Sequence, residues 1–129
     1  MEGDGTPRRG VFNARSRLKS FGYAIQGVGF MLRTQHNAWL HLAATLIVLL
    51  LASSLHVTLS DWRWLIIAIV VVWVAETFNT AVEHLCDVVS PGYSEAVKRA
   101  KDIAAGAVLI CSMGAALVGI VTFWPYVFG

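Results

Sequence analysis

The sequence predicts an all-α integral membrane protein: an amphipathic surface helix followed by three transmembrane helices. Of its 129 residues, 57% are apolar and only 14% are charged, with a mean hydropathy of +0.64. A soluble domain usually carries about 25% charged residues, so this chain has too few to coat a water-exposed surface. The charges also gather between three long apolar stretches. We therefore expect one membrane domain over residues 12–129.

The N-terminal part is predicted to stay outside the bilayer. Residues 1–11 mix glycine, proline and charge without any periodicity, so we expect a disordered tail. In residues 13–33, apolar residues recur at steps of three and four, namely Leu18, Phe21, Ile25, Val28 and Leu32. This period predicts a helix that lies on the membrane surface. The alternative is the first turns of an ordinary packed helix.

Three apolar segments are predicted to cross the membrane, at about residues 37–57, 62–86 and 103–127. The 27 residues from Thr34 to Ser60 contain no Asp, Glu, Lys or Arg, and no charge follows Ile103. About 20 helical residues, at about 1.5 Å each, cover the roughly 30 Å of hydrocarbon. Trp62 and Trp64, at the start of the second segment, suit a membrane interface.

The distribution of basic residues predicts the orientation. Six Lys and Arg residues precede the first span, one lies between the first and second, and three lie between the second and third. By the positive-inside rule, the N-terminus and the second loop are cytoplasmic and the C-terminus is outside. The net charge of +2 gives no reason to expect a nucleic-acid partner.

The second span carries its polar side chains on one helical face. At 100° per residue, Glu76, Asn79, Thr80, Glu83 and Asp87 share this face. A carboxylate at bilayer depth costs about 2.5 to 3.5 kcal/mol even on the lenient insertion scale. The face should therefore meet protein, water or ligand, and a functional site is the default interpretation. The alternative is a structural polar network between helices.

The two glutamates of this face are expected to have different roles. They are seven residues apart, hence about 10.5 Å along the axis, too far to bind one ion together. Glu83 lies near the cytoplasmic surface, where hard oxygen ligands suit Mg²⁺, and Mg²⁺ in turn suggests phosphates. Glu76 lies deeper, which suits a general base for an alcohol presented from the bilayer. We interpret His41 and His84 as structural residues.

The motif AETFNTAVEHLCDVV followed by KRAKDIAAGAVL resembles the prokaryotic diacylglycerol kinase family, which includes undecaprenol kinases. The resemblance runs from about Leu18 into the third span. It implies a homotrimer in the bacterial cytoplasmic (inner) membrane, with active sites on the cytoplasmic side between subunits. It also implies transfer of the γ-phosphate of ATP, with Mg²⁺, to a lipid hydroxyl. In this reading Glu76 is the catalytic base and Glu83 a metal ligand. The nucleotide and phosphate site takes Asn79, Asp87, Lys101, Asp102, Tyr23 and Arg17, with Thr80 beside them.

One position departs from the family pattern. Where the family commonly has a second metal-binding glutamate, this chain has Gln35. Glutamine keeps an oxygen ligand but loses the charge, so we expect weaker Mg²⁺ binding rather than inactivity.

The predicted function is an ATP- and Mg²⁺-dependent lipid kinase that converts diacylglycerol to phosphatidic acid. Undecaprenol is the alternative substrate, because an apolar pocket for either lipid tail leaves little trace in a sequence. Two alternatives without kinase activity stay open. One is a small intramembrane ion-binding or proton-relay subunit. The other is a pseudoenzyme that binds lipid without catalysis, because Gln35 replaces a metal-binding glutamate of the family.

Overall fold

The computed structural model describes residues 14–129, and within them every regular element is a helix. The four helices are α1 (Ala14–Thr34), α2 (His36–Ser54), α3 (Leu59–Val89) and α4 (Glu95–Phe128). The predicted all-α class is confirmed. Helices α2, α3 and α4 are each long and apolar enough to cross a membrane. The expected tail, residues 1–11, lies outside the described residues.

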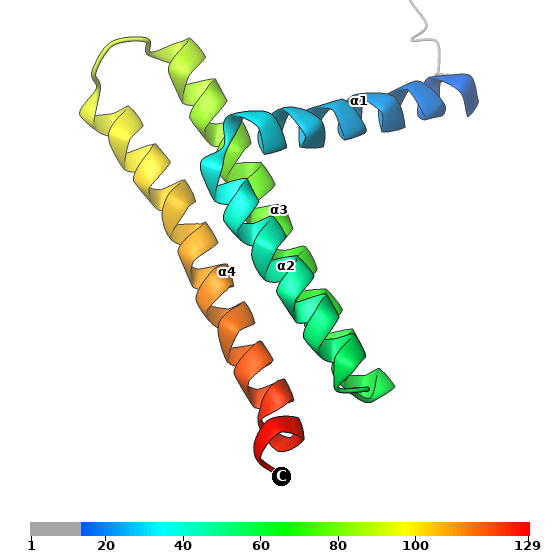
Figure 1. The fold of residues 1–129 in the computed structure, drawn as a ribbon. Helices are drawn as coiled ribbons and strands as arrows, with labels where there is room; N and C mark the ends of the chain where they lie inside the picture. Colours follow the sequence, from blue (N-terminus) through cyan, green and yellow to red (C-terminus); the bar gives the residue numbers. More distant parts are fainter. Residues whose placement is uncertain (1–13) are drawn as a thin grey trace, which may run out of the picture.

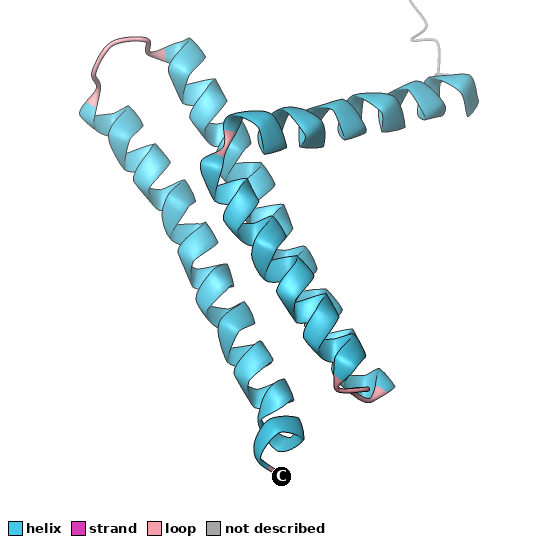
Figure 2. Ribbon diagram, viewed as in Figure 1, coloured by secondary structure: helices cyan, strands magenta, loops and turns pink. Residues whose placement is uncertain are grey.

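The three long helices run side by side, and α1 meets α2 and α3 at one end and extends away from them (Figure 1). The α3–α4 loop is at this same end, whereas the α2–α3 turn and the C-terminus are at the other (Figure 2). Helix α3 packs against both α2 and α4. This arrangement puts the two segments that were predicted to be cytoplasmic at one end of the molecule.

Within the described residues, helix α1 runs from Ala14 to Thr34. Its predicted apolar stripe is largely uncovered within the chain, since Leu18, Phe21 and Ile25 are all exposed. Near its C-terminal end, Met31 is buried, and its sulfur lies 3.6 Å from Thr77 Oγ1 of α3. Helix α1 is therefore anchored to α3 at one end only, and its position on the membrane surface remains a prediction.

Helix α2 ends at Ser54, three residues before the predicted end of the first span, because the chain forms a Schellman turn there. His56 adopts a left-handed conformation, with φ of 49°. The amide of Val57 donates to Ala52 O at 3.2 Å, and that of His56 to Ser53 O at 3.4 Å. These are the two hydrogen bonds that define the motif. Histidine tolerates this conformation better than most residues.

A closed polar network joins this turn to the end of α4. Thr58 caps α3 by accepting a hydrogen bond from the Asp61 amide at 3.2 Å. The hydroxyls of Thr58 and Tyr126 both donate to Asp61 Oδ2, at 2.7 and 2.6 Å. The Thr58 amide donates to the Tyr126 hydroxyl at 3.0 Å. We call Thr58, Asp61 and Tyr126 the Asp61 network; it packs beside the buried cluster of Ala52, Val57 and Leu65.

At the opposite end, α4 begins at Glu95, well before the apolar segment predicted from residue 103. The basic residues 98, 99 and 101 therefore lie on the first turns of α4. In the connecting loop, the Tyr93 hydroxyl donates to Glu95 Oε2 at 2.6 Å. This hydrogen bond to a carboxylate raises the pKa of Tyr93, which keeps the phenol protonated at neutral pH.

Candidate active site

Glu76 is the most unusual side chain of the membrane-spanning region, because it is fully buried without hydrogen bonds. Its exposed fraction is 0%, and neither carboxylate oxygen has a hydrogen-bond partner. It lies in the middle of α3, on the face where Asn79 and Thr80 are also buried. Buried carboxylates in proteins are normally paired or hydrogen-bonded. Glu76 lacks the hydrogen bonds that such a group usually makes.

The nearest partner of Glu76 is His41 of α2. Its Nε2 atom lies 3.6 Å from Glu76 Oε2, which is ion-pair distance but longer than a hydrogen bond. The His41 side chain is largely buried, at 16% exposure. The sequence offered no sign of this pairing, because the two residues are 35 positions apart and His41 lies in an uncharged apolar stretch.

Glu83 lies two turns further along the same face and is held by two amide side chains. Gln35 Nε2 donates to one carboxylate oxygen at 3.0 Å, and Asn79 Nδ2 donates to the other at 3.2 Å. The structure thus brings together Gln35, Asn79 and Glu83. Gln35 is the single residue between α1 and α2, where it is the N-cap of α2. Below, Gln35, His41, Glu76, Asn79 and Glu83 together are called the Glu76 site.

The polar groups around this cluster are incompletely satisfied. Asn79 Oδ1 is buried without a hydrogen-bond partner. Thr80 is also buried, but its hydroxyl donates to the Glu76 carbonyl oxygen at 2.9 Å and is therefore satisfied within the helix. Thr80 is thus satisfied by its own helix, whereas the Asn79 side chain keeps one unpaired acceptor.

The composition of this cluster fits Mg²⁺. Within residues 14–129, no three His, Cys, Asp or Glu side chains converge as a site built from such side chains alone would require. Mg²⁺, however, is usually held by one or two carboxylates together with phosphate oxygens and waters. Glu83 supplies the carboxylate, and amide rotation would turn an oxygen of Gln35 or Asn79 toward the ion. The orphaned Asn79 Oδ1 is consistent with this use.

Lys101 and Asp102 were expected to complete one charged pocket, and the structure divides them between two ion pairs. Lys101 of α4 pairs with Asp87 of α3, which ties the two helices together near their loop. Asp102 pairs with Lys98, one turn earlier on α4, at 2.6 Å. Lys101 is therefore directed toward the acidic face of α3, whereas Asp102 engages a neighbour on its own helix.

The remaining predicted ligands lie on α1. The structure places Arg17 and Tyr23 at exposed positions of this helix, and neither is among the hydrogen-bonding partners of Glu83. Within one chain, the site therefore comprises residues of α2, α3 and the α1–α2 junction, with Asp87 and Lys101 further along.

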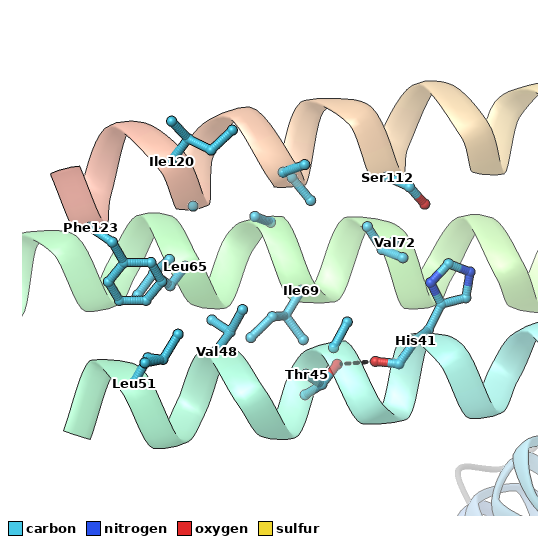
Figure 3. Close-up of a pocket in the computed structure, with 15 residues that line it drawn as sticks. His41, Thr45, Val48, Leu51, Leu65, Ile69, Val72, Ser112, Ile120 and Phe123 are labelled. Carbon is cyan, nitrogen blue, oxygen red and sulfur yellow. Dashed lines mark hydrogen bonds between the residues drawn. The ribbon is translucent and has the colours of Figure 1, made fainter. Parts of the chain in front are cut away.

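A cavity of about 450 Å³ extends from His41 toward the α2–α3 turn, between α2, α3 and α4. Its lining is apolar except at one end. Figure 3 shows His41 and Ser112 at that end, and Leu51, Leu65 and Phe123 at the other. The hydroxyl oxygen of Ser112 is buried and has no hydrogen-bond partner. Sequence reasoning missed Ser112, since a serine in an apolar helix gives no distinctive signal.

The fold and the site define a polytopic helical protein with an acidic centre buried among apolar helices. The family model described as prokaryotic diacylglycerol kinase matches residues 22–123. The chain belongs to this family, and the predicted resemblance is confirmed. It is thus a phosphotransferase of a kinase family that acts on lipid alcohols.

Two curated relatives carry different names. The undecaprenol kinase of Bacillus subtilis (strain 168) is 32% identical over 108 residues, which are 84% of this chain and 88% of that protein. The diacylglycerol kinase of Synechocystis sp. (strain ATCC 27184 / PCC 6803 / Kazusa) is 38% identical over 107 residues. That match covers 82% of this chain and 61% of the cyanobacterial protein.

Proposed function

We propose that this protein transfers the γ-phosphoryl group of ATP to the hydroxyl of a membrane lipid alcohol, with Mg²⁺ as cofactor. The observation that carries the proposal is the buried Glu76 carboxylate without hydrogen bonds, on the same face as Glu83, in a chain of this kinase family. A bilayer-buried base suits a substrate that never leaves the membrane.

In the proposed reaction, Glu76 accepts the proton of the lipid hydroxyl. The hydroxyl oxygen forms a bond to the γ-phosphorus, and the bond to the β,γ-bridging oxygen breaks, so that its electron pair leaves with ADP. Phosphoryl transfer requires mainly positioning and charge neutralisation. One base together with cationic groups at the phosphates is therefore sufficient chemistry.

Glu83, with the amide oxygens of Gln35 and Asn79, would hold the magnesium ion. When bound, Mg²⁺ neutralises phosphate charge and orients the phosphates. Lys101 is the cation we assign to the phosphates, and its present partner Asp87 holds it against the acidic face of α3. Asp102, Tyr23 and Arg17 remain proposed nucleotide ligands.

Self-association as a homotrimer is part of the proposal. A Cβ atom added at Gly106, Gly114 or Gly119 of α4 would meet nothing within 4 Å in the chain. These glycines are therefore not needed for close packing within one subunit, which leaves them free to serve packing between subunits. We place the protein in the bacterial cytoplasmic membrane, with the Glu76 site toward the cytoplasm.

Diacylglycerol is the proposed acceptor. The support is the higher identity, 38%, to the cyanobacterial relative that is named diacylglycerol kinase. Undecaprenol is the second candidate, favoured by the match that covers 88% of the Bacillus protein. Phosphorylation by purified protein in mixed micelles, with each lipid in turn, tests both. Labelling of one lipid identifies the substrate. Labelling of neither lipid by folded protein at high Mg²⁺ would contradict the proposal.

A further inference from the structure

His41 has a place in the site that its isolated position in the sequence does not indicate. Glu76 makes one ion-pair contact within residues 14–129, and that contact is to His41 Nε2 at 3.6 Å. This approach is to Oε2. Glu76 Oε1 is buried and has no hydrogen-bond partner. The imidazole therefore approaches the proposed base at Oε2.

The position of His41 is fixed by contacts between α2 and α3 on either side of it. Toward the loop end, Gln35 donates to Glu83. Toward the turn end, Trp73 Nε1 donates to Thr45 Oγ1 at 3.0 Å. From the first contact to the second, the chain advances ten residues from Gln35 to Thr45 and goes back ten residues from Glu83 to Trp73. The contact between His41 and Glu76 lies between these two hydrogen bonds.

Thr45 also ties the histidine backbone in place. Its hydroxyl donates to the His41 carbonyl oxygen at 2.7 Å, as Figure 3 shows. The imidazole is directed from α2 toward α3, at the polar end of the apolar cavity (Figure 3). Rotation of the ring away from Glu76 would place its polar nitrogens against apolar side chains, which is unfavourable.

From these contacts, we propose that His41 is a positioning residue of Glu76, whose Nε2–H donates to Oε2 and leaves Oε1 directed at the acceptor hydroxyl. The inference rests on the proposed function. The distance of 3.6 Å closes to a hydrogen bond when the substrate is bound, since catalytic hydrogen bonds are often long in unliganded structures. Histidine here acts through Glu76 and does not touch the reacting atoms.

Three substitutions test this role. His41→Leu removes the donor at similar volume. His41→Gln places an amide N–H at about the reach of Nε2, and His41→Asn places it one bond short. The matched control is His36→Leu, the same change at an exposed histidine on the first turn of α2. Each variant is assayed in mixed micelles for kcat and for KM for ATP, with the thermal midpoint measured in the same detergent.

We expect His41→Leu and His41→Asn to lower kcat by about 10- to 100-fold, because small displacements of a catalytic group cost up to about 10²-fold. KM for ATP should stay within about twofold. His41→Gln should keep kcat within about threefold of wild type, and His36→Leu should match wild type.

Two results would overturn the inference: wild-type kcat in His41→Leu, or equal losses in the Gln and Asn variants. Because Gln and Asn are both polar, their comparison holds even where the Leu variant does not fold. If wild-type protein phosphorylates lipid and the His41→Leu variant has the same kcat, only the role of His41 is refuted. Wild-type protein that phosphorylates neither lipid refutes the proposed function, and this inference with it.

Discussion

Two of the four acids of α3, Asp61 in its first turn and Glu76 in its middle, have opposite surroundings. Asp61 accepts hydrogen bonds from two hydroxyls, and its network links the α2–α3 turn, α3 and α4. Glu76, 15 residues and about 22 Å away, is fully buried and accepts none. The first acid is satisfied and holds helices together. The second is unsatisfied, so its burial costs free energy that a structural role would not repay.

This contrast gives a criterion for reading acidic residues in membrane helices. A carboxylate that accepts hydrogen bonds from its own chain, as Asp61 does, stabilises the packing of the helices. A buried carboxylate with an oxygen that accepts no hydrogen bond from the chain, such as Glu76 Oε1, is a candidate for contact with a substrate. Four predictions test the contrast, ordered from the largest effect to the smallest.

The largest effect is expected for Glu76→Gln. The substitution keeps the shape of the side chain but removes the base, so kcat should fall by about 10²- to 10⁴-fold. ATP binding, measured by equilibrium titration, should change by less than about twofold. Asp61→Asn is the matched control, since it removes an acid from the same helix. It should lower the thermal midpoint and leave kcat at the wild-type value below the transition. A Glu76→Gln variant as active as wild type would show that Glu76 is not the base.

Glu83→Gln is expected to act through magnesium. With its carboxylate gone, the Mg²⁺ concentration needed for half-maximal rate should rise by about tenfold or more, or activity should disappear. A magnesium titration of the lipid kinase rate measures this directly. An unchanged titration curve would remove Glu83 from the metal site and leave it as a partner of Gln35 and Asn79 only.

A smaller effect in the opposite direction is expected for Gln35→Glu. Gln35 contacts Glu83 at 3.0 Å, so a carboxylate here would add a second negative charge beside the proposed ion. The half-maximal Mg²⁺ concentration should fall by about threefold. The same magnesium titration decides the matter. If the requirement for Mg²⁺ does not change, the neutral side chain does not weaken the site.

Tyr126→Phe should have the smallest effect on activity. It removes the hydroxyl that donates to Asp61 and accepts from the Thr58 amide. Each of these two hydrogen bonds contributes about 1 kcal/mol, so the thermal midpoint should fall by about 6 °C with kcat unchanged. A large loss of kcat in a folded Tyr126→Phe protein would mean that the Asp61 network and the Glu76 site are coupled, and the contrast between them would fail.

The sequence was sufficient for the fold class, because uncharged stretches of spanning length allow few other structures. It also placed Glu76, Asn79 and Glu83 on one face, since helical periodicity alone determines that. The helix boundaries were less accurate. The polar start of α4 and the Schellman turn at His56 depend on local hydrogen bonds that hydropathy does not register.

The contacts between helices were beyond the sequence. Periodicity indicates which residues share a face, but not which residue of another helix lies opposite. The approach of His41 to Glu76 and the pairing of Lys101 with Asp87 depend on the register of α2 and α4 against α3. Nor did the sequence reveal the unpartnered Ser112 hydroxyl, whose importance comes from its position at the polar end of the cavity.

The most direct test of the central claim is transfer of labelled γ-phosphate from ATP to diacylglycerol and to undecaprenol, in mixed micelles at saturating Mg²⁺. Wild type, Glu76→Gln and Asp61→Asn are assayed together, each shown to be folded. The account predicts a labelled lipid with wild type and with Asp61→Asn, and a loss of at least about 10²-fold with Glu76→Gln. Equal labelling by all three proteins, or labelling by none, would contradict it.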